Sequence, residues 1–300
     1  MNAEVHVAEA SIPVDLFNPG QVFACIGLAE AADMLLGDAE GCFDWSNRDA
    51  PRFWLHANGD QNPIEHALRF VSQATVVAEA PNASTNISTW NKSWGATPEE
   101  LPAGAPYPSP DPDSPATLVA VLSTSERKLR IDYWADTVRD NVKFWAGAGG
   151  YPGAALTRDA LKLIRDAAVD SVNDPFALAV PQSSSFRLDW RRDYVPIDAG
   201  FSLNKHGGAV RTVGYPLVEL LGAIGLTHAR PRRLKTKLAY RYGVVGTSRE
   251  ATWLPLSFLR AVLGASATPF ETRYFHIHLS WPSKEGQARA ITQVTEESES

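Results

Sequence analysis

Apolar residues near the start of the chain predict a long buried helix with clear signals at both ends. Asn18 is a favoured N-cap, and Pro19 suits the first position of a helix. The apolar run that follows stops at Gly37, a residue typical of helix C-termini. Because this run is apolar around most of its circumference, we expect the helix to be buried.

The next segments predict short elements and then a break. Residues 41–45 and 52–57 have strand composition on either side of a turn, and residues 63–73 predict a second helix. Residues 80–116 change character, since seven of the chain's 21 prolines lie between Pro98 and Pro115. We expect a proline-rich surface loop over this range.

The remainder mixes helical and strand patterns without a repeat or a regular strand–helix–strand alternation. The sequence therefore predicts an α+β fold of mixed antiparallel sheets and helices. The expected elements are a hairpin (117–123 and 128–134), helices (157–168 and 214–226), strands (186–190, 238–245 and 272–281) and a disordered end (293–300).

We expect three regions along the chain. Residues 1–116 form an acidic N-terminal region that ends in the proline-rich loop. Residues 117–285 form the α+β region, and residues 286–300 a disordered acidic tail.

Composition narrows the class of protein. The chain is 44% hydrophobic and 21% charged, so it can bury a large core. It has no run of about 18 apolar residues, and acids stand where a signal peptide carries positive charge, so we expect a cytoplasmic protein. Cys25 and Cys42 are too few for a disulfide framework or a four-cysteine zinc site.

Charge is divided unevenly along the chain. Residues 1–120 carry a balance of −12, whereas residues 187–241 carry +7. Such a division favours a basic face that binds a polyanion, because each phosphate contact releases counterions. The alternative is that these side chains are solvated or form internal ion pairs. The candidate nucleic-acid-binding residues are Arg187, Arg191, Arg192, Lys205, His206, Arg230, Arg232, Arg233, Lys235, Lys237 and Arg241.

Tryptophan beside lysine occurs twice outside this basic segment. Trp90, Lys92 and Trp94 lie together in the polar loop, where the indoles could stack on bases or simply anchor the loop. Lys143 and Trp145 are further candidates to extend the surface.

No pattern for catalysis or for a cofactor is present. The chain lacks a Walker loop and the H-E-x-x-H and G-x-S-x-G motifs. In the glycine-rich stretch, the third glycine of a dinucleotide fingerprint would fall on Pro152. His276 and His278 share a face of their predicted strand, but no nearby Asp or Glu completes a metal triad by local spacing. We therefore expect no catalytic residue, no metal and no cofactor.

Four stretches together resemble a known family. They are IPVDLFNPGQVFACIGLAEAADMLLGDAEGCF (12–43), IDYWADTVRDNVKFWAGAGG (131–150), FRLDWRRDY with DAGFSLNKHG (186–207), and YPLVELLGAIGLTHARPRR (215–233). The chain is similar, over about residues 12–281, to subunits of the type I-G (formerly I-U) CRISPR effector complex. Within them it resembles the Csb-type short relatives of the Cas-eight-like large subunit.

The resemblance implies a non-catalytic subunit of an RNA-guided surveillance complex in antiviral defence. It implies guide RNA, target DNA, backbone subunits, Cas-five/Cas-six-like subunits and a recruited helicase-nuclease as partners. Recognition of the short flanking motif is also implied, although the chain is short for a large subunit and its N-terminal part is acidic.

Two other functions remain open. One is a protein–protein assembly subunit of the same complex without direct nucleic-acid contact. The other, from a different class, is an unrelated metal-dependent hydrolase that uses His276 or His278.

Overall fold

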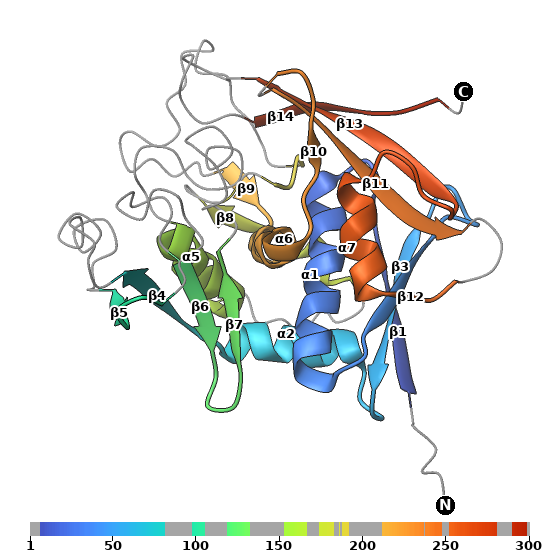
Figure 1. Cartoon of the computed structure of the whole chain (residues 1–300). Helices are drawn as coiled ribbons and strands as arrows, with labels where there is room; N and C mark the ends of the chain where they lie inside the picture. Colours follow the sequence, from blue (N-terminus) through green and yellow to red (C-terminus); the bar gives the residue numbers. More distant parts are fainter. Residues whose placement is uncertain are drawn as a thin grey trace, which may run out of the picture.

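The computed structural model has an α+β fold in which helices are packed between two sheets (Figure 1). It describes residues 7–81, 98–105, 119–132, 153–166, 174–182, 186, 188–191, 212–236, 238–247, 252–280 and 290–298. The proposed mixed sheets and helices are therefore confirmed.

The largest sheet is eight-stranded, with the order β1-β3-β2-β11-β13-β14; β10 pairs with β11, and β12 with β2. Only β2 and β11 pair in parallel; the other neighbours in this sheet are antiparallel. Its strands are β1 (Val7–Pro13), β2 (Glu40–Asp44), β3 (Arg52–Asn58), β10 (Arg232–Arg233), β11 (Ala239–Thr247), β12 (Leu254–Pro255), β13 (Thr272–Ser280) and β14 (Ala290–Glu296).

A second sheet is four-stranded, with the order β5-β4-β6-β7. Its strands are β4 (Thr75–Pro81), β5 (Glu99–Leu101), β6 (Val119–Ser123) and β7 (Lys128–Ile131). β6 and β7 are antiparallel, which confirms the predicted hairpin. A two-stranded sheet joins β8 (Val180–Gln182) to β9 (Thr212–Gly214).

The helices fill the space between the two larger sheets (Figure 1). In Figure 1, α5 lies beside the four-stranded sheet, and α1 and α7 lie along the large sheet. Helix α6 lies between α5 and α1. Their bounds are α1 (Pro19–Leu36), α2 (Pro63–Gln73), α5 (Gly153–Asp166), α6 (Pro216–His228) and α7 (Leu256–Gly264), with a short 3₁₀ turn at η3 (Pro175–Ala177).

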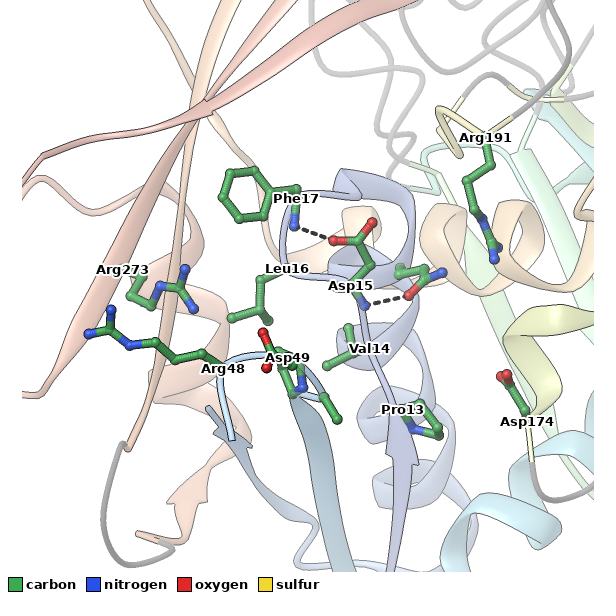
Figure 2. A pocket seen from close by; sticks show the side chains of 13 residues that line it. Pro13, Val14, Asp15, Leu16, Phe17, Arg48, Asp49, Asp174, Arg191 and Arg273 are labelled. Carbon is green, nitrogen blue, oxygen red and sulfur yellow. Dashed lines mark hydrogen bonds between the residues drawn. The ribbon is translucent and has the colours of Figure 1, made fainter. Parts of the chain in front are cut away.

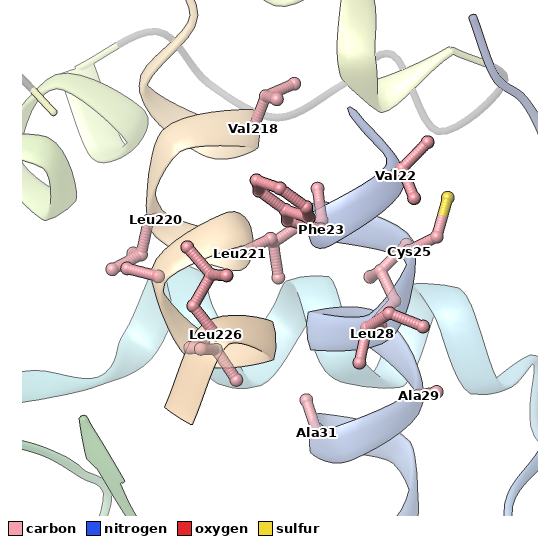
Figure 3. Packing of buried hydrophobic residues seen from close by; sticks show 14 of the residues in the cluster. Val22, Phe23, Cys25, Leu28, Ala29, Ala31, Val218, Leu220, Leu221 and Leu226 are labelled. Atoms are coloured by element: carbon pink, nitrogen blue, oxygen red, sulfur yellow. The ribbon is translucent and has the colours of Figure 1, made fainter. Parts of the chain in front are cut away.

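The core is centred on the contact between α1 and α6 (Figure 3). Both helices are apolar on nearly every side, and both are buried on nearly every side, as the sequence predicts for residues 18–37. Glycines let the two backbones approach: a Cβ atom at Gly27 would lie 1.9 Å from the Leu221 carbonyl oxygen, and one at Gly225 would lie 2.2 Å from that of Phe23. No side chain larger than hydrogen fits at either position without moving a helix.

Helix α1 is long and apolar enough on average to cross a membrane, with a mean hydropathy of 1.2, although Gln21, Glu30 and Asp33 interrupt its apolar residues. However, 78% of the helix is buried inside the protein. That burial is typical of a core helix in a water-soluble protein.

Asn18 caps α1 as predicted, since its side chain accepts a hydrogen bond from the Gly20 amide at 3.1 Å. Asn62 caps α2 in the same way, through the amides of Ile64 and Glu65. These two side chains satisfy donors that the first turn of a helix leaves unpaired.

Three expectations were wrong. The predicted disordered tail contains β14, which pairs along β13 and buries Val294. The proline-rich range contains β5, which pairs in parallel with β4. No strand forms at the described residues of 186–190, because the backbone amides of Leu188 and Asp189 donate to the Glu219 carboxylate rather than to a neighbouring strand.

Candidate nucleic-acid interface

A short basic hairpin follows the C-terminal end of α6. β10 pairs antiparallel with the start of β11, and the Leu234 amide donates to the Ala239 carbonyl at 2.9 Å to close the turn. The exposed cations of this hairpin are Arg232, Arg233 and Lys235, which we name the hairpin cluster. Within the part of the chain that the structure describes, no carboxylate pairs with any of the three.

Arg241 lies directly opposite Arg232 across the β10–β11 pair, but its charge is used internally. Arg241 donates from Nε and Nη2 to the two Glu297 oxygens at 2.5 and 2.9 Å, and from Nη1 to the Ala265 carbonyl at 2.6 Å. Its guanidinium also stacks on the Tyr274 ring, 3.6 Å from the centroid. The hydrogen bond to Glu297 raises the pKa of Arg241. We therefore leave Arg241 out of the phosphate-binding surface.

Arg191 is likewise held within the fold. Its Nε and Nη2 donate to the buried Asp189 carboxylate, with the shortest contact at 2.7 Å, and Nη2 also donates to the Phe176 carbonyl. Its guanidinium lies 3.7 Å from the centroid of the Tyr215 ring. Burial opposes the charge, but hydrogen bonding to Asp189 outweighs it and raises the pKa of Arg191.

Helix α6 separates Arg191 from the hairpin cluster. Arg191 contacts Tyr215, the residue just before α6, whereas the cluster begins shortly after the end of the helix. A helix of 13 residues spans about 20 Å. Arg191 therefore lies at the N-terminal end of α6, and the hairpin cluster follows its C-terminal end.

Arg230 is half-buried and close to an acid. Burial raises the pKa of the Asp132 carboxyl, while the charges of His228, Arg130 and Arg230 lower it in part. Arg230 is thus one of three cations whose charges lower the pKa of Asp132, the residue after β7.

The other candidate residues lie outside the described residues. They are Arg187, Arg192, Lys205, His206 and Lys237 of the basic segment, together with Trp90, Lys92, Trp94, Lys143 and Trp145.

His276 and His278 do share a face of β13, with ring centroids 6.5 Å apart. His276 Nε2 lies 2.5 Å from Glu297 Oε1, whereas His278 is exposed. In the described ranges of the chain, no group of three or more His, Cys, Asp or Glu residues is arranged to hold a metal ion.

The sequence reasoning missed two exposed aromatic residues. Trp190 is 40% exposed beside Arg191, and Phe17 is 37% exposed just before the α1 cap. The predicted strand over residues 186–190 includes Trp190, but the described residues of that range form no strand. Its only signal in the sequence is its place next to two arginines.

Comparisons of the chain with protein-family models, with curated proteins and with solved structures found no match.

Proposed function

We propose that this chain is a non-catalytic nucleic-acid-binding subunit of a type I-G CRISPR RNA-guided surveillance complex. The four stretches that resemble Csb-type subunits support the assignment to the complex. The observation that supports nucleic-acid contact is the hairpin cluster, whose three cations are exposed and have no carboxylate partner among the described residues.

The chemistry of the cluster suits a phosphate backbone. Two arginines offer planar, multi-donor contacts to phosphate oxygens, and the lysine adds a point charge. Phosphate contacts of this kind add affinity that does not depend on sequence. In this assignment, the partners are guide RNA, target DNA, the backbone and Cas-five/Cas-six-like subunits, and the helicase-nuclease that the complex recruits. A cytoplasmic location and a part in flanking-motif recognition belong to the same proposal.

The test is DNA binding by the assembled complex at several salt concentrations. The variant R232A/R233A/K235A should bind more weakly, and its salt dependence should fall by a slope of about 2–3, because each lost duplex-phosphate contact removes roughly 0.9. The control is R127A/K128A, which removes two exposed cations at the β6–β7 hairpin instead of three. Equal affinity and equal slope for the hairpin variant and the wild type would refute the nucleic-acid role of the cluster.

The second candidate is an assembly subunit that binds other proteins only. It is favoured by the internal pairing of Arg191 and Arg241, which leaves a smaller basic surface than the sequence implies. Crosslinking of the purified complex distinguishes the two candidates. Adducts between residues 232–235 and nucleic acid support the first, and adducts to acidic protein segments alone support the second.

A further inference from the structure

A cavity of about 400 Å³ opens on the side of the large sheet where three turns meet (Figure 2). It lies between the β1–α1 turn, the β2–β3 turn and the segment around η3. This volume is within the range of small-ligand sites. The lining residues on which the argument depends are Val14, Asp15, Leu16, Phe17, Gln21 and Arg48.

One aromatic side chain, Phe17, lines the cavity. Phe17 is 37% exposed, and its ring is held edge-on against Phe275 with the centroids 5.1 Å apart. Val14 and Leu16 are buried beside it and make the wall apolar. An exposed aromatic ring fixed in this way is a surface for stacking a planar ligand.

Polar groups stand next to this apolar wall. Gln21 is only 5% exposed, and its Oε1 accepts a hydrogen bond of 2.7 Å from the Asp15 amide. Its Nε2 has no hydrogen-bond partner among the described residues. The Asp15 carboxylate accepts from the Phe17 amide through Oδ1, which leaves Oδ2 for another donor. The wall therefore offers an amide donor and a carboxylate acceptor side by side.

The cavity lining carries no excess of positive charge. Three guanidiniums and three carboxylates line it, and the guanidiniums of Arg191 and Arg273 are already paired with Asp189 and Glu296. Arg48 is exposed and has no carboxylate partner within the described ranges. A polyphosphate gains little from such a lining. An uncharged hydrogen-bonding ring with a single phosphate at Arg48 matches it better.

We propose that this cavity binds one unpaired nucleobase of a nucleic-acid strand. The base stacks on Phe17, its polar edge meets Gln21 and Asp15, and its phosphate lies at Arg48. Amide and carboxylate groups are the side-chain chemistry that reads base edges, and aromatic stacking accepts any base. The inference rests on the proposed function and names the class of substrate for a second site, distinct from the hairpin cluster.

The test compares two short single-stranded oligonucleotides of equal length with the purified full chain. One carries all of its bases, and the other is abasic at its central positions while its phosphates are unchanged. The wild type should bind the base-containing strand roughly 10-fold more tightly, at the same salt slope. Phe17→Ala and Gln21→Glu should each remove this preference without weakening the abasic complex. Gln21→Glu keeps the acceptor for the Asp15 amide but replaces the amide donor with a charged carboxylate, and the abasic strand controls for the effect of that added charge.

Two controls separate this inference from the proposed function. Phe258→Ala removes a phenylalanine that is 46% exposed elsewhere and should keep the preference. R232A/R233A/K235A should weaken both complexes equally. If the wild type binds both strands equally well, the cavity does not bind a base, although the proposed function stands. If it binds neither strand, the base-binding inference fails, and the proposed function is decided by the test on the assembled complex.

Discussion

Asn18 and Asp189 are 171 positions apart in the chain, yet Asn18 Nδ2 donates a hydrogen bond of 2.9 Å to Asp189 Oδ1. Both side chains are buried. The same Asn18 side chain caps α1, and the same Asp189 carboxylate binds Arg191. One amide therefore both begins the central helix and fixes the segment that carries Arg191 against it.

Asn18→Ala should reduce the free energy of unfolding by about 2–4 kcal/mol. The loss of an N-cap costs about 1 kcal/mol, and the buried Asp189 carboxylate loses a donor in addition. Chemical denaturation measures the difference. Asn62→Ala removes the cap of α2. Because the hydrogen bonds of the Asn62 side chain are exposed or half-buried, this change should reduce the free energy of unfolding by only about 1 kcal/mol. Equal losses in the two variants would mean that the bond to Asp189 contributes nothing.

The close packing of α1 against α6 should require glycine, which has no Cβ atom, at specific positions. Gly225→Ala should destabilise the protein by about 3 kcal/mol or more, because its Cβ atom would overlap the Phe23 carbonyl oxygen, a backbone atom that cannot turn aside. Thermal unfolding gives the magnitude. On the same helix, the closest contact of a Cβ atom at Gly222 is the end of the Leu188 side chain, at 3.0 Å, which can change rotamer. The expected effect of Gly222→Ala is below about 1 kcal/mol. If both substitutions are tolerated alike, the helices do not pack as closely as described.

Local signals explain why much of the fold could be predicted. The caps of α1 and α2, the apolar runs of α1 and α6 and the β6–β7 turn are all encoded within a few residues. The prediction failed where partners are distant. From the sequence alone, Glu296 and Glu297 have the pattern of a solvated acidic tail. In the structure they pair with arginines far away in the chain: Glu296 with Arg273, 23 positions away, and Glu297 with Arg241, 56 positions away.

The candidate nucleic-acid interface also depends on partners that are distant in the chain. The sequence predicted the sign of the charge over residues 187–241, but not which cations would be used internally. Arg241 and Arg232 are equivalent in a charge count. Only the pairing of β11 with β13, and of β13 with β14, gives Arg241 a carboxylate and leaves Arg232 exposed. The cavity around Phe17 and Gln21 had no signal in the sequence, because its lining comes from turns far apart in the chain.

Glu297 should make part of the stability depend on pH. The hydrogen bond to Arg241 lowers the pKa of the Glu297 carboxyl below its ordinary value of 4.5. Burial has a smaller effect and raises this pKa, and the hydrogen bond to His276 lowers it again. A carboxyl whose pKa is lower in the folded state stabilises the protein fully above its unfolded pKa, and this contribution is lost as the pH falls through the folded pKa. Glu297→Gln should therefore reduce the free energy of unfolding by about 1 kcal/mol at pH 7, since the pair is partly exposed, and this reduction should shrink steadily below about pH 4.5.

Urea unfolding of Glu297→Gln and the wild type from pH 7 to pH 3 measures this change. The control is Glu126→Gln, at an exposed position in the β6–β7 turn, whose stability should not approach that of the wild type as the pH falls. A difference between Glu297→Gln and the wild type that stays constant over that range would show that the carboxylate charge does not stabilise β14 against β11 and β13.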